Sequence, residues 1–248
     1  THSWLPEHNL EPIFNERVGL VFEAESVSKE DLQEAYRLLF PGKRLEYLAF
    51  GVPLTTVDRV ANNSYISQSI DNQRSFGLYV AHPSENAETL LQNLKNGGFV
   101  GVKPYLSYVT WKALEEVRIR DFLTDAMLEL AHTYRLPVML HVPREKRIAD
   151  PDNITDLLYI AKYYPKARII LAHAGRAYSS DIIHTALEKL EGTNFWLEFS
   201  NVQSADVVDE VLKKMPLERV MYGSDIPVAV VRGYMFMLNG QRVALTRK

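Results

Sequence analysis

Short, nearly continuous apolar runs alternate along the chain with longer stretches in which apolar residues recur every three or four positions. The first pattern is typical of buried strands and the second of amphipathic helices. Ser75–Ala81 illustrates the strand pattern, and the helical pattern that follows it at 87–94 is ended by Gly97 and Gly98. Because the two patterns alternate with tight linkers, we expect parallel strands joined by crossover helices.

Seven strands are expected from Leu45 onward. They are Leu45–Val52, Ser75–Ala81, Phe99–Val102, the runs that end on His141 and on His173, Asn194–Phe199 and Val220–Tyr222. Helices are expected at Lys29–Leu39, Thr56–Ile70, Asp121–Arg135 and Asp206–Met215, in the stretch before Gly97, after a cap at Asn153 and around Ile183–Leu190.

This alternation predicts an α/β fold, most simply a (β/α)8 TIM-like barrel whose eighth strand comes from the opening region or from residues before Thr1. We expect one domain over residues 1–248, with an irregular N-terminal part at 1–44 and the barrel core at 45–227. Only 21 residues follow Pro227, so the last barrel helix is expected to be incomplete. An open doubly wound sheet is the alternative, but no strand is followed by its G-x-G-x-x-G turn.

Composition narrows the functional classes. The 248 residues are 24% charged with a net charge of −3, which argues against a nucleic-acid binder. No apolar run reaches the length of a membrane span, so we expect a soluble, cytoplasmic protein whose partner is a small molecule. Cysteine is absent, so a metal site would have to use histidines and carboxylates.

Polar side chains stand where the expected strands end, which is where α/β barrels carry their functional residues. They are His82, Lys103, His141, His173, Glu198 and Asp225. Lys103 and His141 are 38 positions apart, and His141 and His173 are 32 apart, as in successive β/α units. We therefore expect these side chains to converge. Imidazole and carboxylate ligands suit Zn²⁺, the ion expected first, or Mn²⁺ or Fe²⁺.

Five segments resemble one family in the correct order. LPVMLHVP, ARIILAHAG, FWLEFSN and RVMYGSDIP resemble strands five to eight of the amidohydrolase superfamily, and GGFVGVKPY resembles strand four. The most similar branch is the amidohydrolase-related group that also contains aminocarboxymuconate semialdehyde decarboxylase. The resemblance covers about Leu45 to Pro227. It implies a metal-dependent (β/α)8 barrel that hydrolyses small molecules or, in some members, decarboxylates them.

The resemblance also implies roles for single residues. His141 matches the strand-five metal ligand. His173 matches the strand-six histidine, which either binds a second metal or polarises the substrate and moves protons. Asp225 matches the strand-eight aspartate, a ligand that can also accept a proton from water. The opening Thr1-His2-Ser3 resembles the tail of a His-Thr-His motif on strand one, whose first histidine would lie before residue 1, and this makes His2 a ligand. If that motif is not intact, the site lacks the two histidine ligands of strand one.

The remaining candidates keep more than one interpretation. Lys103 is a carboxylated lysine bridging two metals, a cation for a substrate carboxylate, or a partner of Glu198, and the last two are favoured. Glu198 is that partner or orients a ligand histidine. Tyr105 belongs to a substrate lid or packs its own loop. Arg144 and Arg176 add positive charge near the mouth, which suggests an anionic substrate or solvated loop charges.

We therefore expect a metal-dependent hydrolase acting on an amide, ester or lactone of a small anionic molecule through a metal-activated water. Asp225 would take the proton of that water, and His173 would stabilise the oxyanion or protonate the leaving group. The first alternative is a metal-dependent decarboxylase. The second is a non-catalytic barrel that binds or scaffolds. Barrels of this group commonly form homodimers, which the sequence leaves open.

Overall fold

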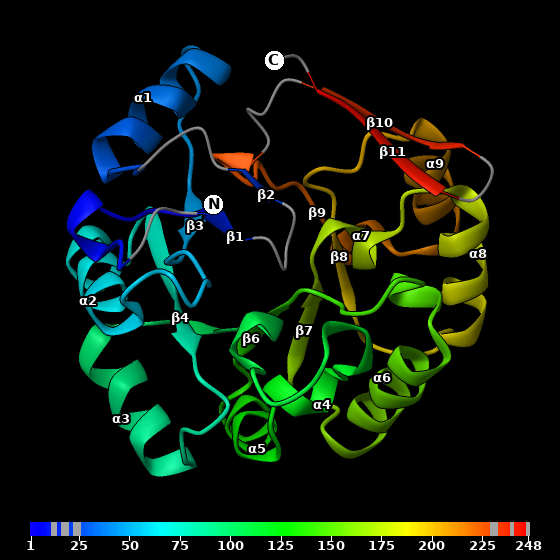
Figure 1. Ribbon diagram of the computed structural model, residues 1–248, viewed down its shortest axis with the longest axis horizontal. Coiled ribbons are helices and arrows are strands. Elements are labelled where there is room, and N and C mark those ends of the chain that lie inside the picture. Colours follow the sequence, from blue (N-terminus) through cyan, green and yellow to red (C-terminus); the bar gives the residue numbers. More distant parts are fainter. Residues whose placement is uncertain (11–13, 16–19, 22–25, 229–232, 239–240, 247–248) are drawn as a thin grey trace.

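The computed structural model describes residues 1–10, 14–15, 20–21, 26–228, 233–238 and 241–246. At its centre are seven parallel strands, hydrogen-bonded to one another in their sequence order. Figure 1 shows the strands curling around a common axis with the helices outside them. The fold is an incomplete (β/α)8 barrel, as the alternating pattern predicts. The strands are β3 (Tyr47–Ala49), β4 (Ser75–Ala81), β5 (Gly101–Pro104), β6 (Pro137–Leu140), β7 (Arg168–Leu171), β8 (Trp196–Glu198) and β9 (Val220–Met221).

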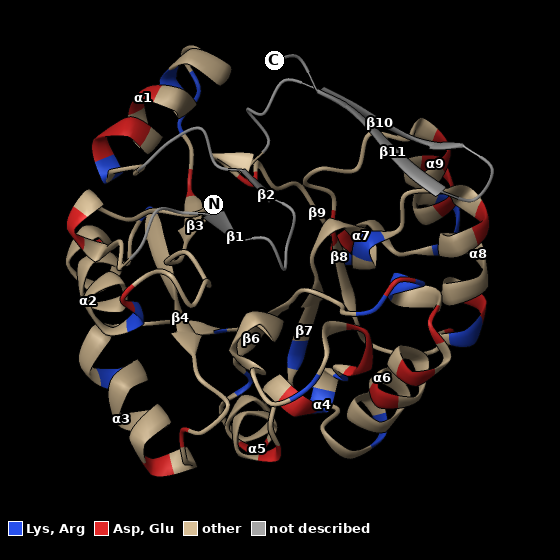
Figure 2. Ribbon diagram, in the orientation of Figure 1, with Lys and Arg blue, Asp and Glu red and all other residues tan. Residues whose placement is uncertain are grey.

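Helices follow the strands in the expected order. They are α1 (Lys29–Leu39), α2 (Arg59–Ser69), α3 (Ala87–Gly97), α4 (Ile119–Phe122), α5 (Asp125–Tyr134), α6 (Pro151–Tyr163), α7 (His173–Arg176), α8 (Ser180–Lys189) and α9 (Ala205–Lys214). Short 3-10 turns lie at Pro6–His8, Leu106–Tyr108, Leu114–Glu116, Arg147–Ala149 and Leu217–Arg219. Within the described ranges, no helix is long and apolar enough to cross a membrane. Basic and acidic segments are interspersed on the outer helices (Figure 2).

The sheet is apolar on both faces, as expected of parallel strands covered by helices on one side and closed on themselves on the other. Leu78, Val102, Leu140, Leu171 and Leu197 are almost completely buried. The strand pairing is in parallel register from Tyr47 opposite Ser75 through to Glu198 opposite Met221. All these strands run in the same direction, so the loops that leave their carboxyl ends share one end of the barrel.

The opening segment lies between the two edges of the sheet. His2 forms a parallel bridge with Phe50, just beyond β3, and its N–H donates to the carbonyl oxygen of Ile226, beyond β9, at 2.8 Å. The N–H of Ser3 donates to Phe50, and the buried amide of Asn62 donates to the Ser3 carbonyl at 2.9 Å. This segment thus takes the place of a further strand, at the carboxyl ends of its neighbours.

The predicted helix at Asp121–Arg135 is two helices, α4 and α5. Leu123 leaves the helical conformation, with φ −98° and ψ 83°, and is completely buried. Thr124 is extended and precedes α5. Tyr134 has the helical spacing of the buried Met127 and Leu130 but is 49% exposed at the end of α5.

Asp150, rather than Asn153, caps α6. Its side chain accepts a hydrogen bond from the backbone N–H of Asp152 at 3.0 Å. Asn153 is completely buried, and its amide donates to the carbonyl oxygens of Pro143 and Arg147. The prediction that Asn153 is the cap is wrong because this side chain ties α6 to the loop after β6.

Two short hairpins lie outside the barrel. β1 (Phe14–Asn15) pairs with β2 (Leu20–Val21), and β10 (Gly233–Leu238) pairs with β11 (Gln241–Thr246). Among the residues described after Val228 there are strands but no helix, so the expected incomplete last helix is not found in that part of the chain.

Candidate active site

The four predicted metal ligands lie together at the carboxyl ends of the strands. His141 directly follows β6, His173 begins α7 beyond β7, Asp225 follows β9, and His2 lies beside β3. The ring centroids of His141 and His173 are 5.3 Å apart. Nε2 of His2 is 3.4 Å from Oδ1 of Asp225, and Nε2 of His173 is 4.0 Å from Oδ2. The fold thus gathers residues that are far apart in the sequence.

Strained backbone is concentrated in the same loops. Nine non-glycine residues of the described chain have positive φ, and seven of them follow strands β6 to β9. These seven are Arg144, Arg147, His173, Ala174, Arg176, Asn201 and Asp225. Such conformations cost of order 1 kcal/mol or more each and persist where the surrounding structure imposes them. The directions of His173 and Asp225 are therefore set by the fold and not by local preference.

Backbone carbonyls determine which ring nitrogen carries hydrogen in His2 and His173. Nδ1 of His2 is 3.3 Å from the carbonyl oxygen of Gly51, and Nδ1 of His173 is 2.9 Å from that of Ser200. Because a carbonyl oxygen can only accept, we assign the hydrogen to Nδ1 in both rings. Both Nε2 atoms face Asp225, so each is open either to a proton shared with the carboxylate or to a cation.

Asp225 is buried among these groups as an anion. Burial acts to raise the pKa of Asp225, but His2 and His173 outweigh it and lower that pKa to about 2. Burial lowers the pKa of His2, which favours its neutral ring. The amide of Asn201 donates to Oδ2 of Asp225. Imidazole nitrogens this close to a carboxylate need a proton or a cation between them, and the lowered pKa of Asp225 agrees with positive charge at this place, so the arrangement suits a cation.

His141 adds an unused nitrogen to the same region. Its Nδ1 is buried and has no hydrogen-bond partner among the described residues. Burial, and then the charge of Arg176, lower the pKa of His141 well below its ordinary value, so this ring is neutral as well. Its ring lies 5.0 Å from that of Tyr105. A buried nitrogen without a partner is costly, and a bound metal would satisfy it.

Glu198 organises the backbone around His173. Its Oε2 accepts from the N–H of His173 at 3.2 Å and from the hydroxyl of Ser200 at 2.8 Å, and its Oε1 accepts from the N–H of Ser200 at 2.6 Å. Gly223 makes room for this carboxylate, since a Cβ there would lie 1.7 Å from Oε1. Of its two expected roles, Glu198 has the geometry for orienting a histidine.

Lys103 is not paired with Glu198. In the part of the chain that the structure describes, no carboxylate lies within 4 Å of its ammonium, so the predicted pair is wrong. Nζ lies instead over the rings of Phe50 and Tyr105, 5.2 and 5.3 Å from their centroids. Burial lowers the pKa of Lys103 to about 8, although Asp225 and Glu198 oppose the shift. A buried ammonium of this kind suits a substrate carboxylate.

The two arginines differ in what holds them. Nε of Arg144 is 3.3 Å from Asp150, and its Nη1 is 2.8 Å from Asp152, so its charge is already compensated. Arg176 donates from Nη1 to the carbonyl of Val142, and its buried Nε has no partner among the described residues. Arg176 also influences the charge state of His141. Arg176 is therefore the arginine better placed to meet an anion at the site.

The donor set fits a divalent metal in its chemistry. Imidazole nitrogens and a carboxylate are ligands of Zn²⁺ and Mn²⁺, and the second nitrogens of His2 and His173 are held by carbonyls, as is usual for metal-binding histidines. As they stand, however, no three His, Asp or Glu side chains within the described ranges form a group that could hold a metal ion. His2 and His173 are each close to Asp225. For a metal ion to bind three ligands here, His141 would have to become a ligand as well.

Sequence reasoning assigned no role to Gly51 or Asn201. Gly51 acts through its backbone carbonyl, which any residue type carries, so its identity was no guide. Asn201 reaches Asp225 from the neighbouring strand, and its position after β8 was the only local signal. His82, also at a strand end, is bonded to Ser84 in its own loop, which agrees with a place at the rim.

Comparisons with known proteins agree with this architecture. A family model described as amidohydrolase matches residues 35–246. A probable 2-pyrone-4,6-dicarboxylic acid hydrolase from Acinetobacter baumannii, with citric acid bound, superposes with a TM-score of 0.64 at 17% identity, covering 91% of this chain and 82% of that one. A 5-carboxyvanillate decarboxylase from Novosphingobium aromaticivorans, complexed with manganese and 4-hydroxy-3-methoxy-5-nitrobenzoic acid, has a TM-score of 0.60 at 15% identity, covering 88% and 75%.

A third solved structure, an apo protein from Agrobacterium tumefaciens, has a TM-score of 0.59 at 14% identity and covers 93% of this chain and 80% of its own. No curated protein matches the sequence. At these identities the structural likeness establishes the fold.

Proposed function

The chain belongs to the amidohydrolase family, and on that premise we propose that it is a metal-dependent hydrolase of a small anionic amide, ester or lactone. The observation that carries the proposal is the pair of imidazole Nε2 atoms that face Asp225, while the other nitrogen of each ring is held by a backbone carbonyl. A buried carboxylate opposite these nitrogens requires positive charge between them, which a bound divalent metal would supply.

His2, His141 and Asp225 would hold the metal, and His173 would stand beside it. A divalent ion held there would supply a water of lowered pKa and a positive charge for an oxyanion. Zn²⁺ is our first choice, and Mn²⁺, present in the decarboxylase from Novosphingobium aromaticivorans, is the second. Nδ1 of His173 is held by the carbonyl of Ser200, so its Nε2 is the nitrogen that could take up a proton and return it to a leaving group. Asp225 can accept a proton from water.

Lys103, Arg176 and Tyr105 would recognise the substrate. Lys103 supplies a buried ammonium, and Arg176 a guanidinium with an unpaired Nε. The ring of Tyr105 lies 5.3 Å from Nζ of Lys103 and 5.0 Å from the ring of His141, and it would stack on a flat substrate. Two cations that have no carboxylate partner among the described residues favour an anionic substrate. The citric acid bound to the hydrolase from Acinetobacter baumannii is a ligand of that charge.

Metal content separates the roles of two histidines. We expect His141→Asn to lower the metal retained after dialysis by roughly 10- to 100-fold, since it removes a ligand. His173→Asn should keep the metal and lose activity by about 10²-fold or more, since it removes a proton carrier. Elemental analysis and hydrolysis of 2-pyrone-4,6-dicarboxylate would measure both. Equal metal loss in the two variants would contradict this division of roles.

Decarboxylation is the second candidate, favoured by the likeness to the manganese-containing decarboxylase. The same groups would then support protonation at carbon and loss of CO₂. The two reactions separate cleanly if the protein is incubated in H₂¹⁸O with 2-pyrone-4,6-dicarboxylate and with 5-carboxyvanillate. Incorporation of ¹⁸O without CO₂ supports hydrolysis, and CO₂ without ¹⁸O supports decarboxylation.

A non-catalytic barrel is the third candidate, and it is favoured by the lack of a pre-assembled three-ligand group among the described residues. Protein purified without chelators and then dialysed against Zn²⁺ or Mn²⁺ distinguishes it. A metal content well below one ion per chain after both treatments would leave the non-catalytic interpretation standing and remove the hydrolase.

A further inference from the structure

Asn62 on α2 connects the opening segment to the loop after β3 through a single side chain. This residue is only 1% exposed, and both halves of its amide are hydrogen-bonded. Nδ2 donates to the carbonyl oxygen of Ser3 at 2.9 Å, and Oδ1 accepts from the backbone N–H of Val52 at 2.8 Å. The residues that adjoin these two partners, His2 and Gly51, belong to the candidate active site.

The bond to Val52 fixes the same peptide group that holds the ring of His2. The N–H of Val52 and the carbonyl of Gly51 belong to one planar unit and point in opposite directions. Asn62 accepts from the N–H, and Nδ1 of His2 lies 3.3 Å from the carbonyl oxygen. Because the unit is rigid, holding its N–H also sets the direction of its carbonyl, and that carbonyl orients the imidazole.

Gly51 allows the amide of Asn62 to approach this peptide group. A Cβ at position 51 would lie 2.5 Å from Oδ1 of Asn62 and 2.8 Å from its Cγ, closer than such atoms pack. The second bond of Asn62, to the Ser3 carbonyl, holds the backbone one residue beyond His2. One buried amide thus fixes both the main chain that carries His2 and the carbonyl that its ring contacts.

We propose that Asn62 is a positioning residue for His2, acting through the peptide group between residues 51 and 52 so that Nε2 of His2 faces Asp225. The inference rests on the proposed function, in which His2 and Asp225 hold a metal ion. Partners that orient a metal-binding histidine affect metal affinity strongly, although they do not touch the metal themselves. Loss of the Asn62 amide should therefore weaken metal binding while every ligand stays in the chain.

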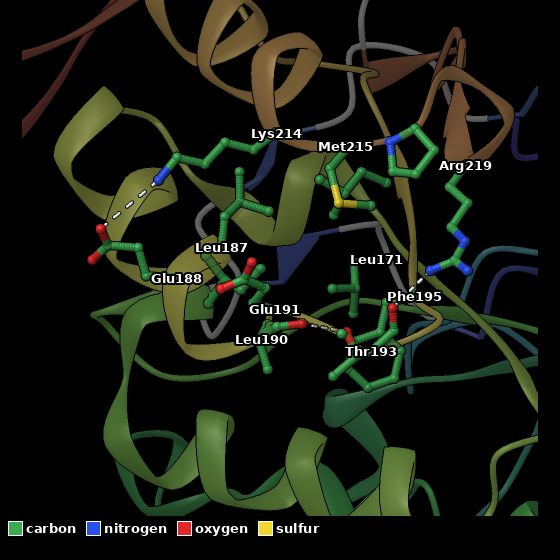
Figure 3. A pocket seen from close by; sticks show the side chains of 14 residues that line it. Leu171, Leu187, Glu188, Leu190, Glu191, Thr193, Phe195, Lys214, Met215 and Arg219 are labelled. Carbon is green, nitrogen blue, oxygen red and sulfur yellow. Dashed lines mark hydrogen bonds and ion pairs between the residues drawn. The ribbon is translucent and has the colours of Figure 1, made fainter.

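Asn63, the next residue of α2, is a matched control. It is also buried, and its amide donates to the carbonyl oxygen and accepts from the N–H of Val80 on β4, both at 3.0 Å. Asn62→Ala and Asn63→Ala therefore remove the same two kinds of hydrogen bond from similar surroundings. Leu187→Ala controls for a general loss of packing, because Leu187 on α8 lines the pocket shown in Figure 3, and α8 lies across the barrel from α2 (Figure 1).

The Zn²⁺ affinity of the full chain, measured by competition with a chromophoric chelator, separates positioning from folding. We expect Asn62→Ala to weaken Zn²⁺ binding roughly 10- to 100-fold, the usual loss for a partner of a metal-binding histidine. Asn63→Ala and Leu187→Ala should change it by less than about threefold, since their partners lie on other strands. In a His2→Gln background, Asn62→Ala should also cost less than about threefold. Equal effects of the two asparagine variants, or an undiminished effect without His2, would overturn the proposal.

The Nδ1–H signal of the His2 ring in ¹⁵N NMR spectra of the metal-free chain provides a second test, and its absence in His2→Gln assigns it. Asn62→Ala should shift this signal or remove it through faster exchange, whereas Asn63→Ala should leave it in place. A chain that shows this difference but binds no Zn²⁺ would refute the metal-dependent function and support the positioning role. A signal that is absent from the wild type, or unmoved in Asn62→Ala, would contradict that role. If melting temperatures show that Asn62→Ala is unfolded, Asn62→Ser, which retains one hydrogen-bonding group, replaces it in both tests.

Discussion

Replacing Glu198 by glutamine is the sharpest test of the site geometry, because the change conserves shape and removes one acceptor. The carboxylate accepts three hydrogen bonds, two of them from backbone N–H groups of His173 and Ser200. A glutamine has one oxygen that accepts and one NH₂ that only donates. Whichever way the amide turns, one of the two backbone N–H groups faces a donor and loses its partner.

The expected cost follows from these bonds. A hydrogen bond to a charged group contributes about 1.5–3 kcal/mol, and a buried donor left without a partner costs about 1–3 kcal/mol. Relief from burying a carboxylate, which is only 5% exposed here, offsets part of this. We expect Glu198→Gln to lower the free energy of unfolding by about 2 kcal/mol, which is about a 30-fold change in the unfolding constant.

Urea unfolding of metal-stripped protein, followed by circular dichroism at pH 7, measures this loss. Glu34→Gln is the matched control, since Glu34 also accepts two hydrogen bonds, from the exposed side chain of Arg37 on α1. An exposed pair of this kind contributes little to stability, because water screens it. If Glu198→Gln were no more costly than Glu34→Gln, Glu198 would not be holding the backbone of His173, and our account of the site would be wrong.

Three further predictions follow from the same region. Gly223→Ala should lower the free energy of unfolding by about 2 kcal/mol, because its Cβ would lie 1.7 Å from Oε1 of Glu198. The double variant with Glu198→Gln should lose less of this free energy than the two single variants added together. The pKa of Lys103 is about 8 in the folded chain against an ordinary 10.5, so the unfolded chain binds more protons between these values and stability rises with pH there. Relative to Lys103→Met, the wild type should gain about 3 kcal/mol between pH 8 and 10.5 in urea unfolding, and a constant difference would contradict a buried ammonium. Arg176→Gln should raise KM for an anionic substrate by about tenfold or more. Arg144→Gln should leave KM nearly unchanged, because Arg144 is already paired with Asp150 and Asp152. A larger effect of Arg144→Gln would show that Arg144, and not Arg176, meets the substrate.

The order of strands and helices was determined by the sequence alone. Periodicity predicts α1 with the bounds Lys29–Leu39 and β4 with the bounds Ser75–Ala81, and both are confirmed. The sequence predicts these elements because their buried apolar positions recur with the period of a helix or a strand. The pattern is less informative where a helix meets several surfaces. Leu38 and Leu39 lie on the same apolar stripe of α1 as Leu32, yet they are 64% and 53% exposed, because the part of α1 around Leu32 is what packs on the core.

The sequence also placed the chemistry at the strand ends, since a parallel barrel brings those ends to one side. His141, His173 and Asp225 could be singled out because each follows a short apolar run. Their partners could not. Glu198 lies beside His173 and not beside Lys103 because adjacent strands set the spacing, and no local pattern contains that spacing.

Only the tertiary structure decided which ring nitrogens face Asp225. Those orientations depend on the carbonyl oxygens of Gly51 and Ser200, which every residue type possesses, and on positive φ angles that the surrounding fold imposes on His173 and Asp225. The sequence thus specifies which residue types the site contains. The directions of these side chains arise when strands far apart in sequence fix the backbone around them, because hydrogen bonds to backbone groups carry no signature in the sequence.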